Sequence, residues 1–373
     1  MLSAGEVSGD IHAAYLAEEI KRLNPEARLF GMGSERMRAA GVDIRFDIAR
    51  QATIGLIETF PNIPKIYLTF LNMKRLLIKE KPNLLILIDS QGFNVPLAKF
   101  AKTLGIKTTY YIPPQEWLWG TAKNTKTIAH TLDHIIAIFE KEYTIYKDSG
   151  ANVSYFGHPL LDIVKPSLNK NLFCEKYGLS AEFPILSLCP GSRSHELNLL
   201  LSSLIETAKL LKNKIPNIQF ILPLSAIWLK PAIYKGFRKH HFCCPIIQDD
   251  TYNSLMHSDA VLAASGTINL EACILGAPNL MFYKLSPLTY WIGKNLLKIG
   301  KKMRFFSMPN IIADEKIIPE IIQKDVSPKN LFKHTLSLLE NKNKIRSSFG
   351  KVLSRLGPSG AIRNSAQAIL SFL

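Results

Sequence analysis

Two glycine-containing turns in the second half of the chain carry groups that could bind phosphate. The first lies in the segment CPGSRSHE and contains Gly191, Ser192 and Arg193. Glycine lets a ligand approach the backbone, the start of a helix offers free N–H groups, and a guanidinium group fits a phosphate. By itself, this segment could equally be an ordinary strand-to-helix turn with a serine cap.

The second turn, in the segment ASGTINLE, follows the same pattern. Ser265, Gly266 and Thr267 could present N–H and hydroxyl groups to a phosphate. Glu271, about one helical turn further on, could accept hydrogen bonds from a ribose. Both turns are expected after apolar strands, at the edge where doubly wound sheets bind ligands. Together they favour a nucleoside diphosphate site over two unrelated turns.

Other kinds of nucleotide chemistry are disfavoured by what these turns lack. Neither turn matches G-x-x-x-x-G-K-[ST] or G-x-G-x-x-G, the patterns of P-loop ATPases and dinucleotide dehydrogenases. The sequence has no D-x-D pair for a divalent ion, and Asp249 and Asp250 are expected to cap and begin a helix. We therefore expect no metal and no cofactor, and the charge of a leaving diphosphate would fall to Arg193 and the helix starts.

A candidate general base lies in the first half of the chain. Asp89 follows the apolar run LLILI, so it should lie at the carboxyl end of a buried strand, although it could also merely cap the next helix. Glu6 and Asp10 are the competing carboxylates, and Asp10 is expected to cap or begin the first helix. Ser8 and Gly9, in the same segment, fit turn formation as well as substrate contact.

Short apolar strands that alternate with helix-like stretches must position these residues. The alternation predicts an α/β fold with two doubly wound halves, each built around a parallel sheet. The predicted strands are 83–89, 106–112, 134–139, 184–189, 218–222, 259–263 and 278–282. The stretch 157–171 loses this alternation and contains two prolines, so we place a linker there and a domain boundary near residue 168.

Length and composition agree with this division. The 373 residues exceed what one hydrophobic core usually supports, so we expect domains at 1–168 and 169–345, followed by a helical segment at 346–373. No apolar stretch is long enough to span a bilayer and the first residues do not resemble an export signal, so the expected compartment is the cytoplasm. The five cysteines lack the spacing of metal ligands.

The net charge of +16 predicts an anionic partner, which could be nucleic acid, a lipid surface or a phosphorylated substrate. Nucleic acid is disfavoured because no helix-turn-helix, RNA-binding sheet signature or zinc finger is recognisable. Segments 54–79 and 284–304 mix basic and apolar residues, as do helices that lie on anionic lipid. The alternative is a core-facing helix with a solvated basic side.

Eight motifs, spread from residue 3 to residue 312, resemble the lipid-A-disaccharide synthases. They are SAGEVSGD, LIDSQGFN, YYIPPQEWLW, FEKEY, YFGHPL, CPGSR, SGTINLE and MPNII. The resemblance implies two facing Rossmann-like domains, the glycosyltransferase B architecture, and an inverting transfer without a metal. The implied reaction joins UDP-2,3-diacylglucosamine to 2,3-diacylglucosamine 1-phosphate and yields UDP and the β-1,6-linked disaccharide of lipid A. Such acylated substrates imply peripheral attachment to an anionic surface, the cytoplasmic face of the inner membrane.

The resemblance also implies roles for individual residues. It places Asp89 at the reacting centre and Glu6, Ser8 and Asn310 around the cleft. The residues that it places near UDP are Arg193, Ser265, Gly266, Thr267 and Glu271. From their positions in the sequence we add Gly9 to the cleft, Gly191 and Ser192 to the UDP site, and Glu6 as the next candidate base.

The chain departs from the family pattern at two places. Only two residues precede Ser3, where the family has a fuller strand, so we expect the first strand to be poorly held. In YYIPPQEWLWG, the residues Gln115, Glu116 and Gly120 differ from the family, which leaves the acceptor contacts of this loop open.

Two other kinds of enzyme with this architecture are alternatives. One is the transferase that adds N-acetylglucosamine to the peptidoglycan lipid precursor, and the other is the UDP-sugar 2-epimerases. Either would keep the phosphate turns but need different loops in the first domain. The segments LIDSQGFN and PPQEWLW favour the synthases.

Overall fold

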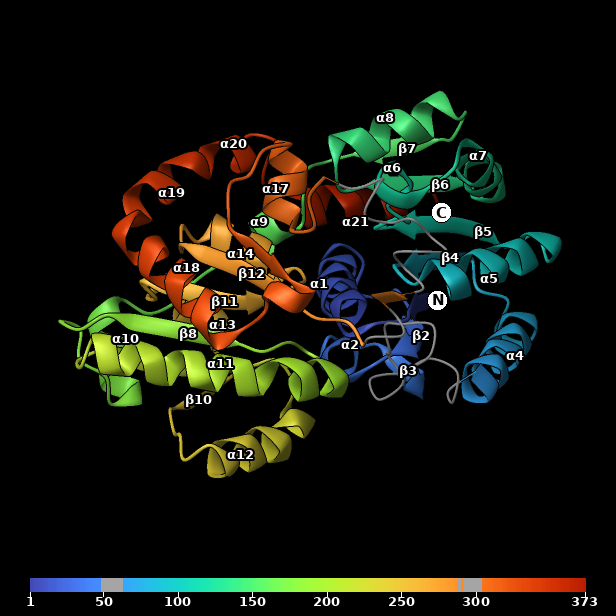
Figure 1. Cartoon of the computed structure of the whole chain (residues 1–373). Helices are drawn as coiled ribbons and strands as arrows, with labels where there is room; N and C mark the ends of the chain where they lie inside the picture. Colours follow the sequence, from blue (N-terminus) through green and yellow to red (C-terminus); the bar gives the residue numbers. More distant parts are fainter. Residues whose placement is uncertain (48–62, 287–289, 292–303) are drawn as a thin grey trace. The chain divides into compact units, whose positions relative to one another are not determined.

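The computed structural model describes residues 1–47, 63–286, 290–291 and 304–373 (Figure 1). The chain divides into two compact units. Unit 1 consists of Met1–Ile163 and Leu356–Leu373, and unit 2 of Val164–Arg355. None of the helices in these described ranges is long and apolar enough to cross a membrane.

Unit 1 contains a seven-stranded parallel sheet in the order β3-β2-β1-β4-β5-β6-β7. Its strands are β1 (Leu2–Ala4), β2 (Phe30–Gly33), β3 (Asp43–Asp47), β4 (Leu84–Ile88), β5 (Lys107–Tyr111), β6 (His134–Ala137) and β7 (Val153–Tyr155). Its helices are α1 (Val7–Leu23), α2 (Glu35–Ala39), α4 (Ile63–Glu80), α5 (Gln91–Thr103), α6 (Glu116–Trp119), α7 (Ala122–Thr131), α8 (Glu140–Asp148), α9 (Leu160–Ile163) and α21 (Ala361–Ser371). Helices α4, α5 and α7 pack together, and α1 packs against β1, β4 and α21.

Unit 2 repeats this plan with a six-stranded parallel sheet in the order β10-β9-β8-β11-β12-β13. Its strands are β8 (Ile185–Cys189), β9 (Gln219–Leu224), β10 (Ile246–Gln248), β11 (Ala260–Ala264), β12 (Asn279–Tyr283) and β13 (Glu320–Ile322). Its helices are α10 (Lys170–Tyr177), α11 (Ser194–Lys214), η2 (Ile227–Leu229), α12 (Lys230–Lys239), α13 (Thr251–Met256), α14 (Ile268–Ile274), α17 (Met308–Ala313), η3 (Gln323–Asp325), α18 (Pro328–Glu340), α19 (Lys342–Ser348) and α20 (Gly350–Leu353).

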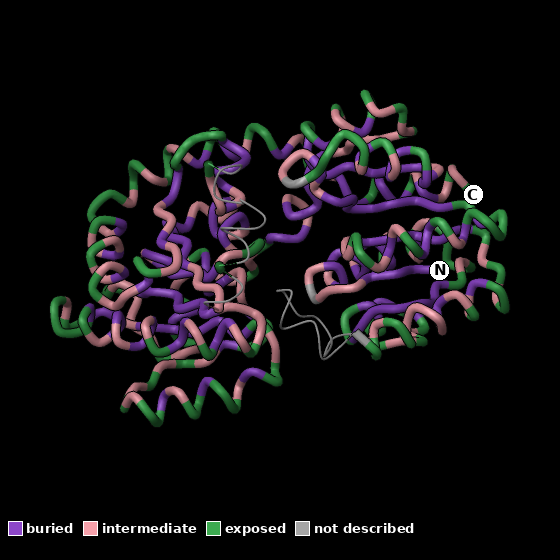
Figure 2. The backbone as a smooth tube through the Cα atoms, turned by 45° about the vertical axis from the view of Figure 1, so that its right-hand side comes forward, coloured by how far each residue is buried: buried purple, intermediate pink, exposed green. Residues whose placement is uncertain are grey.

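The central strands form because continuous apolar runs suit a parallel sheet that is covered on both faces. All five residues of β4, of β8 and of β11 are buried, and Figure 2 shows buried segments, in purple, inside each unit. The seven strands that the apolar runs predict are confirmed, and so is the α/β fold with two parallel sheets.

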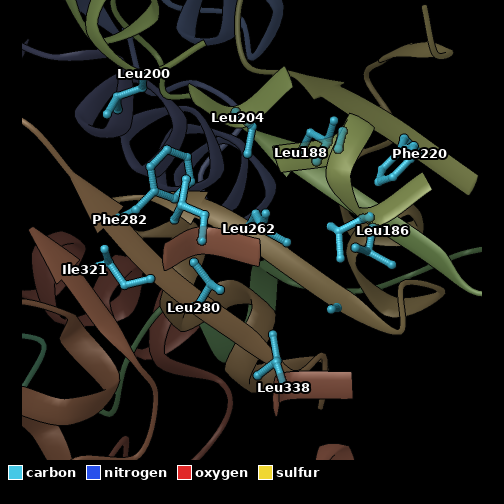
Figure 3. Close-up of a cluster of buried hydrophobic side chains, with 14 of the residues drawn as sticks. Leu186, Leu188, Leu200, Leu204, Phe220, Leu262, Leu280, Phe282, Ile321 and Leu338 are labelled. Carbon is cyan, nitrogen blue, oxygen red and sulfur yellow. The ribbon is translucent and has the colours of Figure 1, made fainter. Parts of the chain in front are cut away.

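One face of the sheet in unit 2 illustrates how the core forms. Leu200 and Leu204 of α11 and Leu338 of α18 are buried against this face (Figure 3). Helices α11 and α18 also contact each other over the sheet. Burial of these apolar side chains stabilises the unit and fixes where α11 begins, next to the first candidate phosphate turn.

The expectation that the first strand is poorly held is wrong. β1 lies inside the sheet, where it pairs with β2 on one side and with β4 on the other. Leu2 and Ala4 are fully buried. Pairing on both edges holds even a three-residue strand, because its backbone groups have partners on each side.

The last helix, α21, belongs to unit 1 and packs against α1. The carboxylate of Asp162 accepts hydrogen bonds from the backbone N–H groups of Gly360, at 2.6 Å, and Ile362, at 2.9 Å, so it caps the start of α21. This grouping differs from the sequence-based division, which places the boundary near residue 168 and treats 346–373 as one separate segment. The chain passes from unit 1 to unit 2 between residues 163 and 164, and residues 346–355 group with unit 2.

Candidate active site

The candidate residues follow the central strands of both sheets. In each sheet the strand order reverses between two neighbouring strands, β1 and β4 in unit 1 and β8 and β11 in unit 2. Ligands of doubly wound sheets bind at the carboxyl ends of the strands at such a point. Glu6 and Asp89 follow the first pair of strands, and the two glycine-containing turns follow the second.

Asp89 follows β4, and its backbone adopts an unusual conformation. Its φ is +54° and that of Ser90 is +51°, which is uncommon for residues other than glycine. Asp89 is half-buried. One carboxylate oxygen, Oδ1, accepts the backbone N–H of Ser90 at 2.8 Å, and the other lies 3.4 Å from the Ser8 hydroxyl. Asp89 thus interacts with the start of α5, but it also adjoins the turn after β1.

Three buried side chains hold the backbone in this strained conformation. The backbone carbonyl of Asp89 accepts hydrogen bonds from the Tyr110 hydroxyl at 2.6 Å and from Asn94 Nδ2 at 2.8 Å. Asn94 also accepts a hydrogen bond from the Ser3 hydroxyl, at 2.7 Å. Strain of this kind persists only where the surroundings enforce it, and it is common at functional sites.

The turn after β1 lies against Asp89. Gly9 is buried, and a Cβ placed on it would lie 3.6 Å from Cβ of Asp89. A Cβ on Gly5 would overlap the side chain of Ser90, so this close approach requires glycine. Glu6 occupies the N-cap position of α1, without a side-chain capping hydrogen bond, and is half-buried. These positions bring Glu6, Ser8 and Gly9 to the same edge of the sheet as Asp89.

Asp10 has a different role from that of a reacting carboxylate. It lies in the first turn of α1, as expected, but its carboxylate accepts the backbone N–H groups of Ser34, at 2.6 Å, and Arg36, at 3.2 Å. Asp10 therefore caps α2. Burial raises its pKa, although these N–H groups act in the opposite direction.

The first turn of unit 2 is organised by Glu196, a residue whose role the sequence alone does not reveal. Its Oε2 accepts the backbone N–H of Ser192 at 2.8 Å, and its Oε1 accepts a hydrogen bond from Arg193 Nη1 at 3.0 Å. Gly191 has a φ of +119°, and a Cβ there would overlap the Glu196 carboxylate. The side chain of Glu196 is 1% exposed and that of Arg193 is 20% exposed. Glu196 thus orients both the turn and the guanidinium group.

The second turn leaves its polar groups accessible. Gly266 and Thr267 are exposed, and Ser265 and Glu271 are half-buried. Gly266 has a φ of +143°, and a Cβ there would point into open space. Thr267 occupies the N-cap position of α14, without a side-chain capping hydrogen bond, and Glu271 lies in the first turn of that helix.

A buried amide braces this second turn. Asn269 donates from Nδ2 to the Ala264 carbonyl at 2.9 Å and accepts from Asn279 at 3.0 Å. The two turns of unit 2 lie close together, since they follow β8 and β11, which pair side by side with Ala263 opposite Cys189.

Asn310 is fully buried and bonded inside unit 2. Its Oδ1 accepts the backbone N–H groups of Ile317 and Ile318, and its Nδ2 donates to Glu320 at 2.8 Å. Helix α17, which carries Asn310, packs against α14. The structure therefore places Asn310 behind the second turn, where it can position α14.

A metal site is not apparent in the parts of the chain that the structure describes, since no three His, Cys, Asp or Glu side chains there cluster as ligands would. The sequence predicts Asp249 and Asp250 as the cap and the first turn of a helix, whereas the structure has Asp250 at the N-cap position of α13, and its side chain makes no capping hydrogen bond there. Its carboxylate accepts hydrogen bonds from Lys176 at 2.9 Å and from the Tyr177 hydroxyl at 2.7 Å, so it ties α10 to α13.

The two doubly wound parallel sheets define an α/β fold of the glycosyltransferase B type. Solved structures with the same fold include the Staphylococcus aureus MnaA–UDP co-structure, at a TM-score of 0.68 and 11% identity, covering 100% of this chain and 95% of that one. A putative UDP-N-acetylglucosamine 2-epimerase from Listeria monocytogenes has a TM-score of 0.61 and 12% identity, with coverage of 100% and 95%. At such identities the likeness concerns the fold alone.

Sequence comparison identifies the family. Residues 1–369 match the family model described as Lipid-A-disaccharide synthetase. The Geobacter metallireducens lipid-A-disaccharide synthase is 36% identical, over 100% of this chain and 97% of that protein. The Coxiella burnetii (strain Dugway 5J108-111) synthase is 37% identical, over 99% of this chain and 96% of that protein. The chain belongs to the lipid-A-disaccharide synthetase family, and it is a glycosyltransferase. The expected resemblance is confirmed.

Proposed function

We propose that the protein transfers 2,3-diacylglucosamine from UDP to the 6-hydroxyl of 2,3-diacylglucosamine 1-phosphate. The products are UDP and the β-1,6-linked disaccharide of lipid A. The observation that carries this proposal is the placement of the candidate residues. The half-buried carboxylate of Asp89, on a strained backbone, follows the central strands of one sheet. The two glycine-containing turns, at Gly191 and Gly266, follow the central strands of the other sheet.

In this proposal Asp89 is the general base. As the acceptor hydroxyl attacks the anomeric carbon, its proton passes to the carboxylate of Asp89, the new C–O bond forms, and the bond to the diphosphate breaks. Attack on the face opposite the leaving group inverts the anomeric centre. The network of Ser3, Asn94 and Tyr110 supports this role, because it holds the backbone of Asp89 in one conformation.

The leaving UDP would be stabilised by residues of unit 2. Arg193, oriented by Glu196, offers a guanidinium group to the diphosphate, and the start of the 21-residue helix α11 adds a positive dipole end. Ser265, Gly266 and Thr267 would add polar groups, and Glu271 would accept hydrogen bonds from the ribose. The developing negative charge is then balanced without a divalent ion.

We also propose that the protein attaches peripherally to an anionic membrane surface, where its acylated substrates reside. Tyr67, Leu68 and Ile78 of α4 are 60%, 58% and 52% exposed. Tyr67 and Ile78 are eleven residues apart, close to three helical turns, so they lie on one side of α4. Lys65 and other basic residues of α4 are also exposed. Two segments of the sequence mix basic and apolar residues. Most of segment 284–304 and the first part of segment 54–79 lie outside the described residues.

The direct test is to incubate the purified protein with both diacylated monosaccharides and to detect the products. Disaccharide 1-phosphate and UDP should form in equal amounts, and neither should form when the acceptor is left out. The same protein should leave UDP-N-acetylglucosamine unchanged. Formation of the 2-epimer, with no disaccharide, would instead identify a UDP-sugar epimerase.

A further inference from the structure

A polar pocket of about 330 Å³ lies in unit 1 next to the segment that carries Asp89. The residues that line it are Gln91, Gln115, Glu116, Gly120, Thr121 and Asn124. Its volume is at the lower end of the roughly 300–1,000 Å³ typical of small-molecule sites. Gln91 follows Asp89 by two positions, so a ligand in this pocket would lie close to the candidate base.

Glu116 is the charged residue among the six, and it is only 8% exposed. Its Oε1 accepts hydrogen bonds from Gln91 Nε2 at 2.9 Å and from Asn124 Nδ2 at 2.6 Å. Its Oε2 lies 3.4 Å from the Thr125 hydroxyl. A carboxylate offers about four acceptor positions, so Glu116 retains capacity for a donor from a ligand.

The wall of the pocket that carries Glu116 is firmly anchored. Trp117, the next residue, donates from Nε1 to Glu142 at 3.1 Å. The Tyr146 hydroxyl donates to the Pro114 carbonyl at 2.8 Å. Both anchors come from α8, so α6 and the pocket are shaped before a ligand arrives.

One loop supplies half of the residues that line the pocket. Gln115, Glu116 and Gly120 all come from the stretch between β5 and α7. A Cβ on Gly120 would overlap Oε2 of Glu116 and would lie 2.5 Å from its carbonyl oxygen. The glycine therefore gives the carboxylate its space, and Glu116 and Gly120 form one structural unit.

We propose that this pocket binds the free 4-hydroxyl of the acceptor sugar and that Glu116 accepts its hydrogen bond. A buried carboxylate repels phosphate and attracts neutral donors, so the acceptor's 1-phosphate binds elsewhere. The inference rests on the proposed function. In 2,3-diacylglucosamine 1-phosphate, positions 1, 2 and 3 are substituted and the 6-hydroxyl reacts, which leaves the 4-hydroxyl as the neighbouring donor. Glu116 thus determines specificity for the 4-hydroxyl of the acceptor and does not take part in proton transfer.

The test compares binding of three acceptors to the full-length protein by calorimetry in detergent micelles. The acceptors are 2,3-diacylglucosamine 1-phosphate, its 4-deoxy analogue and its dephosphorylated analogue. Glu116→Gln should weaken binding of the intact acceptor roughly 10-fold or more, as expected for a lost hydrogen bond to a charged group. The 4-deoxy analogue should bind the wild type more weakly by a similar factor, but should bind Glu116→Gln no worse than the intact acceptor does.

Controls separate this outcome from a general defect. Removal of the 1-phosphate should weaken binding by the same factor in both proteins, and UDP affinity should not change. Lys126→Ala, an exposed position on α7 outside the pocket, should behave as the wild type. If Glu116→Gln unfolds, Gly120→Ala provides a second variant, because its new methyl group must displace the carboxylate.

The outcomes are distinguishable. If removal of the 4-hydroxyl weakens acceptor binding by the same factor in the wild type and in Glu116→Gln, the pocket assignment is overturned, even if the wild type produces disaccharide. A wild type that binds the acceptor but releases no UDP refutes the proposed function while leaving the pocket to be judged by the binding data. Absence of any acceptor binding to the wild type overturns both.

Discussion

Asp10 and Asp89 are carboxylates at the same edge of one sheet, yet their surroundings differ. The carboxylate of Asp10 accepts two backbone N–H groups at the start of α2 and is buried. Asp89 is half-buried and sits on a strained backbone that other side chains enforce. Substitution of the first should therefore affect folding, and substitution of the second should affect chemistry.

We predict that Asp89→Asn lowers kcat by at least ~100-fold, because the amide keeps the shape but cannot accept the proton. UDP affinity and the melting temperature should remain near those of the wild type. Asp10→Ala serves as the control, and it should lower the melting temperature because the N–H groups of Ser34 and Arg36 lose their acceptor. If Asp89→Asn turns over normally, Glu6 becomes the candidate base, and Glu6→Gln is the next variant to assay.

We predict that Arg193→Ala weakens UDP binding by roughly 2–3 kcal/mol, as expected for loss of a charge-assisted contact. Glu196→Gln should weaken binding less, since it misorients the guanidinium group without removing it. The double variant should be no weaker than Arg193→Ala, because Glu196 acts through Arg193. Lys209→Ala, about four turns further along the same helix and half-buried, is the control. Additive losses in calorimetric titrations with UDP would show that Glu196 acts independently.

At the scale of elements, α8 joins the pocket loop to the sheet through a buried carboxyl group. Glu142 is 1% exposed and accepts hydrogen bonds from Trp117 Nε1 and from the backbone N–H of Ile138, both at 3.1 Å. Burial raises its pKa from the ordinary value of 4.5 to about 8 in the folded protein, despite these hydrogen bonds. The folded state therefore holds this proton more tightly than the unfolded state does.

The pH dependence of stability follows from this difference. The contribution of Glu142 to the free energy of unfolding is fully present below pH 4.5 and is lost as pH rises through about 8. We predict that wild type loses stability relative to Glu142→Gln between pH 5 and pH 9. Urea unfolding of both proteins, followed by circular dichroism, measures this. A stability difference that does not vary with pH would contradict the prediction.

Elements with long apolar runs could be predicted from sequence, whereas the others depend on partners distant in the chain. The run LLILI predicts β4 directly. The three-residue strands β7, β10 and β13 exist because longer neighbours offer them an edge, which no local pattern reveals. The same holds for the site. Asp89 and Arg193 lie in segments that can be recognised from sequence. The role of Glu196 could not be predicted, because it depends on its carboxylate lying next to Gly191 in the folded chain.

At the scale of the whole molecule, the proposed membrane attachment can be measured directly. We predict that the protein floats with vesicles that contain anionic lipid and that salt weakens this binding, because exposed basic residues contribute to it. Replacing Tyr67 and Leu68 with serine should weaken flotation without changing UDP affinity, since both side chains are exposed. Failure to float at any lipid composition would count against peripheral attachment.

A final prediction concerns divalent ions. Because Arg193 and the helix starts are proposed to balance the charge of the leaving diphosphate, turnover should persist in EDTA. Measuring UDP release with and without the chelator, with and without added magnesium, tests this. Loss of activity in EDTA and its recovery with magnesium would disprove the metal-independent mechanism.

The position of α21 affects the order in which the chain can fold during its synthesis. This helix packs against α1, but the ribosome makes it only after all of residues 164–355. Unit 2 is contiguous, so its core can form as soon as it emerges, whereas unit 1, although it begins first, is complete only after α21 has been made. Until then the face of α1 that α21 covers stays exposed to solvent. Nascent chains that stall between the two events should therefore be recognised by chaperones through α1.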